Sequence, residues 1–139
     1  MISPISITDQ YIIQPSLLDK HKSTIEWLSA AVLWKRELVF FQKLLDQYAP
    51  RFRSVEDKKR IDHFQNIITY YKGELIDSLT TKLRSHEKQL AELLETHNEA
   101  STTYFTQHMQ LMNELESLDN QFRQYKEEFF SFIEQAMKA

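Results

Sequence analysis

The sequence predicts an all-α fold, an antiparallel bundle of long helices with three helices at its base and a projecting two-helix coiled-coil hairpin. Two long stretches repeat apolar residues every seven positions, which is typical of packed helices. A single glycine and three prolines in 139 residues leave few points at which a helix must stop. The length and a hydrophobic fraction of 42% suit one folded domain, which we place at residues 23–139.

The first 22 residues are predicted to form an extended apolar arm. Pro4 and Pro15 prevent a continuous helix in residues 1–22, whereas eight large apolar side chains make a solvated tail unfavourable. We therefore expect the arm to lie along the helices, with at most one short helix after Pro15. Disorder until a partner binds is the alternative.

The first long helix is predicted at about residues 24–48. Ser23 and Glu26 have the spacing of a capping box, and Pro50 should end the helix. Aromatic and aliphatic residues then repeat in heptads from Trp27 to Tyr48. Further apolar residues broaden this stripe, so the helix should face more than one neighbour. They are Leu28, Val32, Leu33, Val39, Phe40 and Leu44.

The second helix is predicted at about residues 55–98, where Ser54 and Asp57 provide a start signal. Its apolar residues advance by three successive steps of four between Tyr71 and Leu83, and such a stutter locally unwinds a supercoil. Gly73, the only glycine, lies in the same stretch. We expect a bend or a change of packing partner there.

The third helix is predicted at about residues 102–137 and has the longest heptad pattern. Two interleaved series mark its inward-facing a and d positions. They are Tyr104, Leu111, Leu118, Tyr125 and Phe132, and His108, Leu115, Phe122, Phe129 and Ala136. Poor helix formers near Ser101 predict a turn at residues 98–102. Without it, the chain from Ser54 to Ala136 would form one rod of about 125 Å, stable only as an oligomer.

The predicted lengths leave part of the hairpin uncovered. Helices joined by short turns should pack antiparallel, with Leu93 beside His108 and Tyr71 beside Phe129 or Phe130. The first helix then ends near the level of Ser78, so the hairpin beyond it lacks a third helix. This segment is acidic: seven carboxylates and one lysine lie between residues 87 and 119.

The open stripe of this acidic hairpin predicts a non-enzymatic protein that works by protein–protein interaction or scaffolding. Self-association into a dimer, or binding to another protein, would cover it. A basic partner surface would suit its charge. The residues expected to make the contact are Leu90, Leu93, His97, Tyr104, Phe105, His108, Leu111 and Met112.

A metal- or small-molecule-binding bundle is the alternative hypothesis, with His97, His108 and Glu95 as candidate ligands. Two features argue against it. No histidine follows a glutamate at the Glu-x-x-His spacing of di-iron bundles, and the chain has no cysteine. The plainer interpretation is that these histidines are polar residues at a/d positions that fix the helix register. We therefore expect neither a metal nor a cofactor.

Other function classes receive no support from the sequence. A net charge of -3 and acidic residues within the basic stretch 51–60 argue against nucleic-acid binding. No catalytic triad or phosphate-binding loop is present in the sequence, so we do not expect an enzyme. Residues 1–10 have no positive charge and no long apolar run, so we expect a cytoplasmic protein that does not bind membranes.

Overall fold

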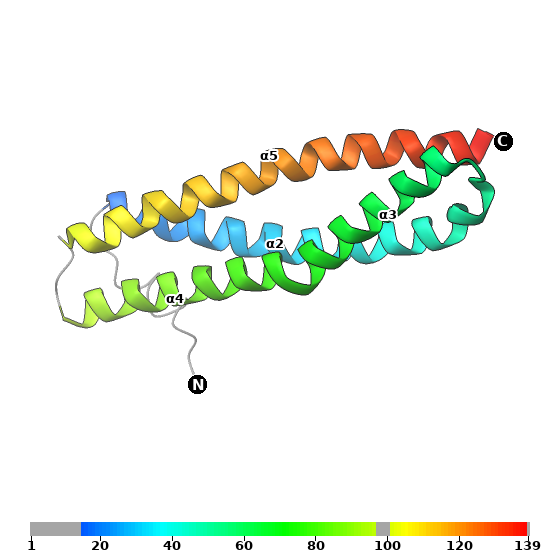
Figure 1. Ribbon diagram of the computed structural model, residues 1–139. Helices are drawn as coiled ribbons and strands as arrows, with labels where there is room; N and C mark the ends of the chain where they lie inside the picture. Colours follow the sequence, from blue (N-terminus) through cyan, green and yellow to red (C-terminus); the bar gives the residue numbers. More distant parts are fainter. Residues whose placement is uncertain (1–14, 97–100, 139) are drawn as a thin grey trace. The chain divides into compact units, whose positions relative to one another are not determined.

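The computed structural model describes residues 15–96 and 101–138, which are almost entirely helical (Figure 1). The elements in chain order are α2 (Pro15–Tyr48), the 3-10 turn η1 (Ala49–Arg51), α3 (Val55–Tyr70), the π-helix η2 (Tyr71–Leu75), α4 (Ile76–Glu95) and α5 (Thr102–Lys138). These described residues contain no β-strand. The predicted all-α class is therefore confirmed.

The helix α2 begins at Pro15 and not near residue 24. Residues 15–22, predicted as part of an extended arm, are therefore helical, and Ser23 lies inside the helix. Proline suits the first position of a helix because its missing N–H would have no intrahelical partner there. The heptad series through Ala31 also continues backwards to Thr24 and Leu17, which are both fully buried. Residues 1–14 of the predicted arm lie outside the described residues.

The structure confirms the predicted start of the second helix and has a π-helix at the predicted stutter. Ser54 caps α3, since its Oγ accepts a hydrogen bond from the backbone N–H of Asp57 at 3.1 Å. The stutter around Gly73 coincides with η2, where the backbone N–H of Ile76 donates to the carbonyl of Tyr71 five residues earlier. A π-helix adds one residue to a turn, so it absorbs the shift in the apolar repeat.

The helices α4 and α5 are separate, which excludes the continuous rod. α4 ends at Glu95 and α5 begins at Thr102. Ser101 precedes α5, and its Oγ accepts a hydrogen bond from the backbone N–H of Tyr104 at 3.4 Å. Residues 97–100 of the predicted turn lie outside the described residues.

The chain divides into two compact units, and α2, α4 and α5 each contribute to both. Unit 1 contains the described residues among Met1–Ala31 and Ser78–Glu116. Unit 2 contains Val32–Asp77 and the described residues of Ser117–Ala139. Each unit has its own buried side chains.

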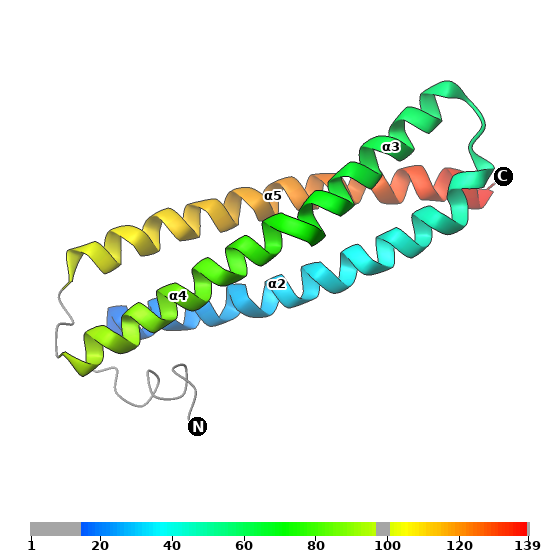
Figure 2. The same ribbon diagram turned by 60° about the horizontal axis from the view of Figure 1, so that its bottom comes forward.

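In unit 1, the first part of α2 lies beside α4 and the first part of α5 (Figure 2). Leu17 of α2 shares a buried cluster with Leu90 and Leu94 of α4 and with Tyr104 of α5. The prediction that this hairpin lacks a third helix from its own chain is therefore wrong. Its cause is the start of α2, which adds about 14 Å of helix relative to a start at residue 24.

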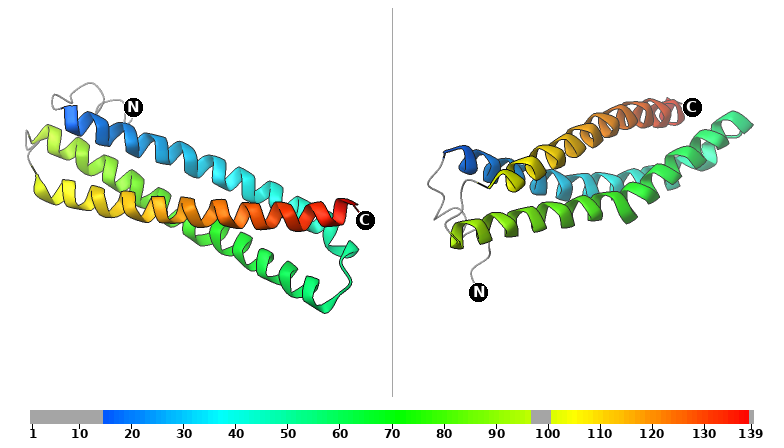
Figure 3. Two further views of the ribbon diagram at one scale, coloured as in Figure 1. Left: turned by 90° about the horizontal axis from the view of Figure 1, so that it is seen from above. Right: turned by 60° about the vertical axis from the view of Figure 1, so that its left-hand side comes forward.

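In unit 2, aromatic side chains from α2, α3 and α5 form the core, and Figure 3 shows these helices from two further directions. The ring centroid of Phe129 lies 5.0 Å from that of Phe41 and 5.3 Å from that of Phe64. Phe52, just after η1, stacks on Phe132 at 4.0 Å. These close ring contacts bury large apolar surfaces and fix the spacing of the helices.

The predicted a/d positions of α5 are all buried, but their partners differ from the prediction by one heptad. His86, and not Leu93, lies against His108. Tyr71 lies against Phe122, with ring centroids 5.8 Å apart, instead of Phe129. Sliding one helix by seven residues keeps the same two faces in contact, so the periodicity alone does not distinguish these registers.

Candidate functional site

Unit 1 holds a group of buried polar side chains, which we call the polar cluster. Its members come from α2, α4 and α5, and each is at most 6% exposed. They are His21, His86, Glu87, Tyr104 and His108. Buried titratable groups are costly unless they are paired, so their contacts decide what the cluster can do.

One contact of the cluster joins His21 to Glu87. The Nδ1 atom of His21 lies 2.5 Å from Oε1 of Glu87. Burial raises the pKa of the Glu87 carboxyl above its ordinary value, and the hydrogen bond and charge of His21 oppose this shift. The other carboxyl oxygen, Oε2, is buried and has no hydrogen-bond partner among the described residues.

The second contact joins two histidines. Nε2 of His86 lies 2.8 Å from Nδ1 of His108, so one nitrogen donates a hydrogen and the other must be an unprotonated acceptor. The pKa of each ring is lowered to about 4, for His86 by burial and for His108 by burial together with the charges of His86 and Lys20. The pair is therefore predominantly neutral at physiological pH.

Tyr104 completes the cluster. Its ring stacks on His86 with 4.3 Å between centroids and 3° between planes. The buried hydroxyl has no hydrogen-bond partner among the described residues. Burial and the charge of Glu87 raise the pKa of this phenol, so it stays protonated.

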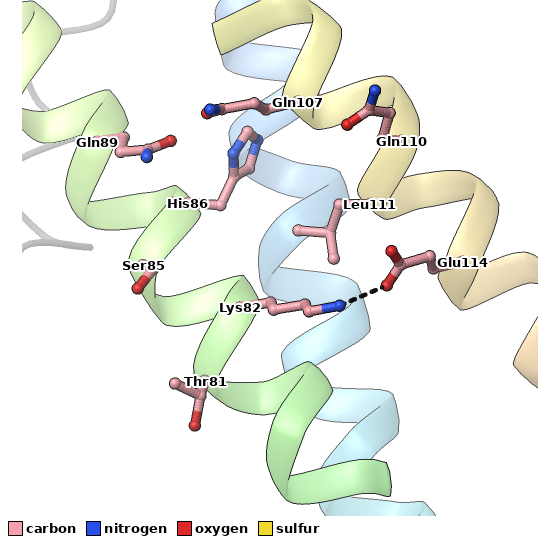
Figure 4. A pocket seen from close by; sticks show the side chains of 9 residues that line it. All are labelled: Thr81, Lys82, Ser85, His86, Gln89, Gln107, Gln110, Leu111 and Glu114. Carbon is pink, nitrogen blue, oxygen red and sulfur yellow. Dashed lines mark hydrogen bonds and ion pairs between the residues drawn. The ribbon is translucent and has the colours of Figure 1, made fainter.

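A groove of about 360 Å³ opens beside the cluster, between α4 and α5 (Figure 4). His86 extends from α4 toward Gln107 of α5, and Lys82 pairs with Glu114 at 3.0 Å. The remaining wall residues are mainly amides and hydroxyls. This lining offers hydrogen bonds but no group activated as a nucleophile.

The structure describes only two of the three predicted metal ligands, His108 and Glu95. His108 bonds to His86, Glu95 is exposed at the end of α4, and His97 lies outside the described residues. Among the residues that the structure describes, no group of three or more His, Cys, Asp or Glu side chains is placed to hold a metal ion. The hypothesis of a metal site therefore gains no support from this geometry.

The predicted interaction residues of the hairpin are mostly interior. Leu90, Tyr104, His108 and Leu111 are buried, Leu93, Phe105 and Met112 are half-buried, and His97 lies outside the described residues. The first part of α2 packs against this surface and covers it. The four buried side chains are not available to a partner while the helices are packed in this way.

Unit 2 carries a different candidate surface, which we call the outer α2 face. It comprises Val32, Leu33, Arg36, Val39, Phe40 and Lys43. Its four apolar side chains are between 40% and 62% exposed. At 100° per residue they lie on the side of α2 opposite to the buried Trp34, Leu38 and Phe41. The sequence predicted this second apolar side, but no described helix covers it.

Two cations lie within the outer α2 face. Arg36 and Lys43 are exposed and form no ion pair with any residue that the structure describes. Lys35, at the edge of the face, instead pairs with Asp77. A shallow depression of about 330 Å³ lies among these side chains. The two cations were not predicted as part of a site, although their seven-residue spacing places them on the same side of the helix.

Comparisons with known protein families, curated proteins and solved structures gave no match to this chain. None of the helices in the described part of the chain is both long and apolar enough to cross a membrane.

Proposed function

We propose that the protein is a non-enzymatic interaction or scaffolding bundle that docks a helical partner on the outer α2 face. The observation that carries this proposal is the exposure of four large apolar side chains on one side of a helix. Contiguous apolar patches of this kind mark interaction surfaces because their burial against a partner is favourable. A helix is the partner shape that matches a straight stripe along α2.

The contacts of the polar cluster support a structural rather than a catalytic role for it. The ring nitrogens that His86 and His108 direct at one another are not available to a substrate, and Glu87 faces His21. His86 also lines the groove, where a catalytic base would need an acceptor atom within hydrogen-bond reach of a reacting atom.

The proposal includes antiparallel, coiled-coil-like packing of α4 and α5 in unit 1. Supporting it, His86 meets His108 while the later Leu94 clusters with the earlier Tyr104. Exposed carboxylates such as Glu92 support the acidic character of this hairpin. A cytoplasmic location stays a prediction from the sequence.

Photo-crosslinking tests the proposed docking face. Benzoylphenylalanine is placed at Phe40 or, as a matched control, at Tyr70, since these unit 2 aromatics are 55% and 50% exposed. After irradiation in native cells, a defined protein adduct is expected from position 40 and not from position 70. The partner is identified by mass spectrometry and purified.

Binding of that purified partner then completes the test. Val39→Ser combined with Phe40→Ser is expected to weaken it by about tenfold or more, because the buried apolar contact is lost. Equal crosslinking from both positions, or unchanged affinity of the double variant, would contradict the proposal. Circular dichroism checks that each variant is folded.

A further inference from the structure

We infer that the segment docked on the outer α2 face is an acidic amphipathic helix of another protein. Its carboxylates would pair with Arg36 and Lys43, and its apolar side chains would cover Leu33, Val39 and Phe40. This inference rests on the proposed function and adds the chemistry of the partner.

The dimensions of the face favour a short helix. From Val32 to Lys43 the residues of the face recur at spacings of three, four and seven, which keeps them on one side of α2. Eleven residues of helix rise about 16 Å, or three turns. A partner helix of three to four turns would therefore cover the whole face.

The two cations decide the charge of this partner. Arg36 and Lys43 lie about 10.5 Å apart along α2. Arg36 lies between the apolar side chains, and Lys43 lies at the end of the face. A purely apolar partner would remove water from both charges without replacing it, which is unfavourable. Two carboxylates spaced seven residues apart on the partner would match both cations.

A second copy of this chain fits the face poorly. If two outer α2 faces met in parallel, Arg36 would face Arg36 and Lys43 would face Lys43. If they met in the antiparallel sense about the midpoint between the two cations, each Arg36 would face a Lys43. If they met about the middle of the face, Arg36 would lie near Val39 and Lys43 near Val32. None of these arrangements gives either cation a carboxylate of the outer α2 face as a partner.

An anionic membrane also fits less well than an acidic helix. Helices that lie in a lipid surface place cations at the borders of the apolar face, from which the side chains reach the headgroups. Here Arg36 lies at the centre of the face, between Val32 and Phe40 on a helical wheel. Insertion of the apolar residues would carry the guanidinium toward the acyl chains.

The test uses two designed fluorescent peptides of about 18 residues, a length at which amphipathic helices form on a surface. Both have the same leucine stripe; one carries glutamates beside it, and the other carries lysines at the same positions. Fluorescence anisotropy measures their binding to the full chain. We expect the acidic peptide to bind roughly tenfold or more tightly than the basic one, and less tightly as salt is raised.

Charge reversal provides the specific variant. Arg36→Glu with Lys43→Glu is expected to lose affinity for the acidic peptide by about tenfold and to gain affinity for the basic one. Lys58→Glu with Lys59→Glu is the matched control, because it changes net charge equally at exposed residues of α3. That control is expected to retain the preference for the acidic peptide.

Several results would overturn the inference. If both peptides bind equally and Val39→Ser with Phe40→Ser abolishes the binding of both, the partner has no charge preference and the acidic helix is rejected. The proposed docking face is then retained. Failure of the acidic peptide to bind, or binding unaffected by the Arg36 and Lys43 reversal, would reject the acidic helix. If the chain binds phosphatidylserine vesicles but neither peptide, a membrane is the favoured occupant of the outer α2 face. If the chain forms a dimer that Val39→Ser with Phe40→Ser disrupts, a second copy is the favoured occupant.

Discussion

Two buried tyrosines on α5 differ in their hydroxyl contacts. The Tyr125 hydroxyl donates to the backbone carbonyl of Phe64 at 3.4 Å, whereas that of Tyr104 has no partner among the described residues. Tyr104→Phe should leave the free energy of unfolding unchanged or raise it by up to about 1 kcal/mol, since an unsatisfied buried hydroxyl is removed. Tyr125→Phe should lower it by about 0.5 to 1 kcal/mol. Urea denaturation measures the free energy of unfolding of both variants. A larger decrease for Tyr104→Phe than for Tyr125→Phe would show that the Tyr104 hydroxyl has a stabilising partner.

The histidine pair predicts a loss of stability in mild acid. His86 and His108 have a pKa of about 4 in the folded chain, below the ordinary 6.5, so the unfolded chain binds their protons first. Their stabilisation is complete above about pH 6.5 and falls as the pH decreases toward 4, by up to about 1.4 kcal/mol per pH unit for each proton. The charge of Lys20 helps to lower the pKa of His108, and Tyr104 does not titrate in this pH range. Glu87, with its raised pKa, opposes the loss.

Urea unfolding between about pH 7.5 and about pH 4.5 measures this dependence. Replacing the pair by His86→Phe and His108→Leu should flatten the curve, whereas His63→Gln, at an exposed histidine of α3, should not. An unchanged slope in the double variant would show that other groups cause the acid sensitivity.

The sequence identified some of these residues but not their pairing. His86 and His108 were recognisable as inward-facing residues of two heptad patterns. Their hydrogen bond depends on which heptads lie at the same level, and the contact of His21 with Glu87 depends on the extension of α2. Both are three-dimensional alignments that side-chain periodicity leaves open.

At the scale of the element, the start of α2 is the clearest departure from the sequence prediction. Leu17 is fully buried against Leu90, Leu94 and Tyr104, so Leu17→Ala should lower the free energy of unfolding by about 2 to 4 kcal/mol. The exposed Asp19→Ala is its control in the same turn. A loss below about 0.5 kcal/mol for Leu17→Ala, measured by urea denaturation, would mean that residues 15–22 do not pack as described.

The π-helix η2 contains a position at which a substitution should raise the free energy of unfolding, whereas Leu17→Ala should lower it. Gly73 is exposed, its φ lies outside the left-handed region, and a Cβ added there would meet nothing within 4 Å. Gly73→Ala should therefore raise the free energy of unfolding by about 0.5 to 1 kcal/mol, because alanine has less freedom to lose on folding. An increase in the melting temperature of roughly 3 °C is expected in a thermal scan. A decrease would indicate that η2 needs the glycine.

Local signals predicted two boundaries: Ser54 caps α3, and Pro50 follows the end of α2. The heptad pattern predicted the buried face of α5, where every predicted a/d position is buried. The start of α2 was missed because the capping spacing at Ser23 outweighed the heptad series running back to Leu17. The capping pattern is local, whereas the burial of Leu17 depends on contacts with distant helices.

For the whole molecule, the expected partner site moves from the acidic hairpin to the outer α2 face. The sequence pointed to the acidic hairpin, but most of those side chains are interior in unit 1. The outer α2 face also has two cations and no carboxylate to pair with them in a second copy, which disfavours self-association through it. Size exclusion with light scattering should therefore give the 16.7 kDa monomer over a range of concentrations. A dimer that Val39→Ser with Phe40→Ser disrupts would contradict this expectation.

The most direct test of the docking surface is NMR chemical-shift mapping. The full ¹⁵N-labelled chain is titrated with the acidic helical peptide, and the backbone amide shifts are followed residue by residue. We expect the largest shifts at residues 32–43 of α2, and their loss in the Arg36→Glu with Lys43→Glu variant. Shifts centred instead on residues 90–112 of the hairpin, or no shifts at a saturating peptide concentration, would contradict the outer α2 face as the docking site.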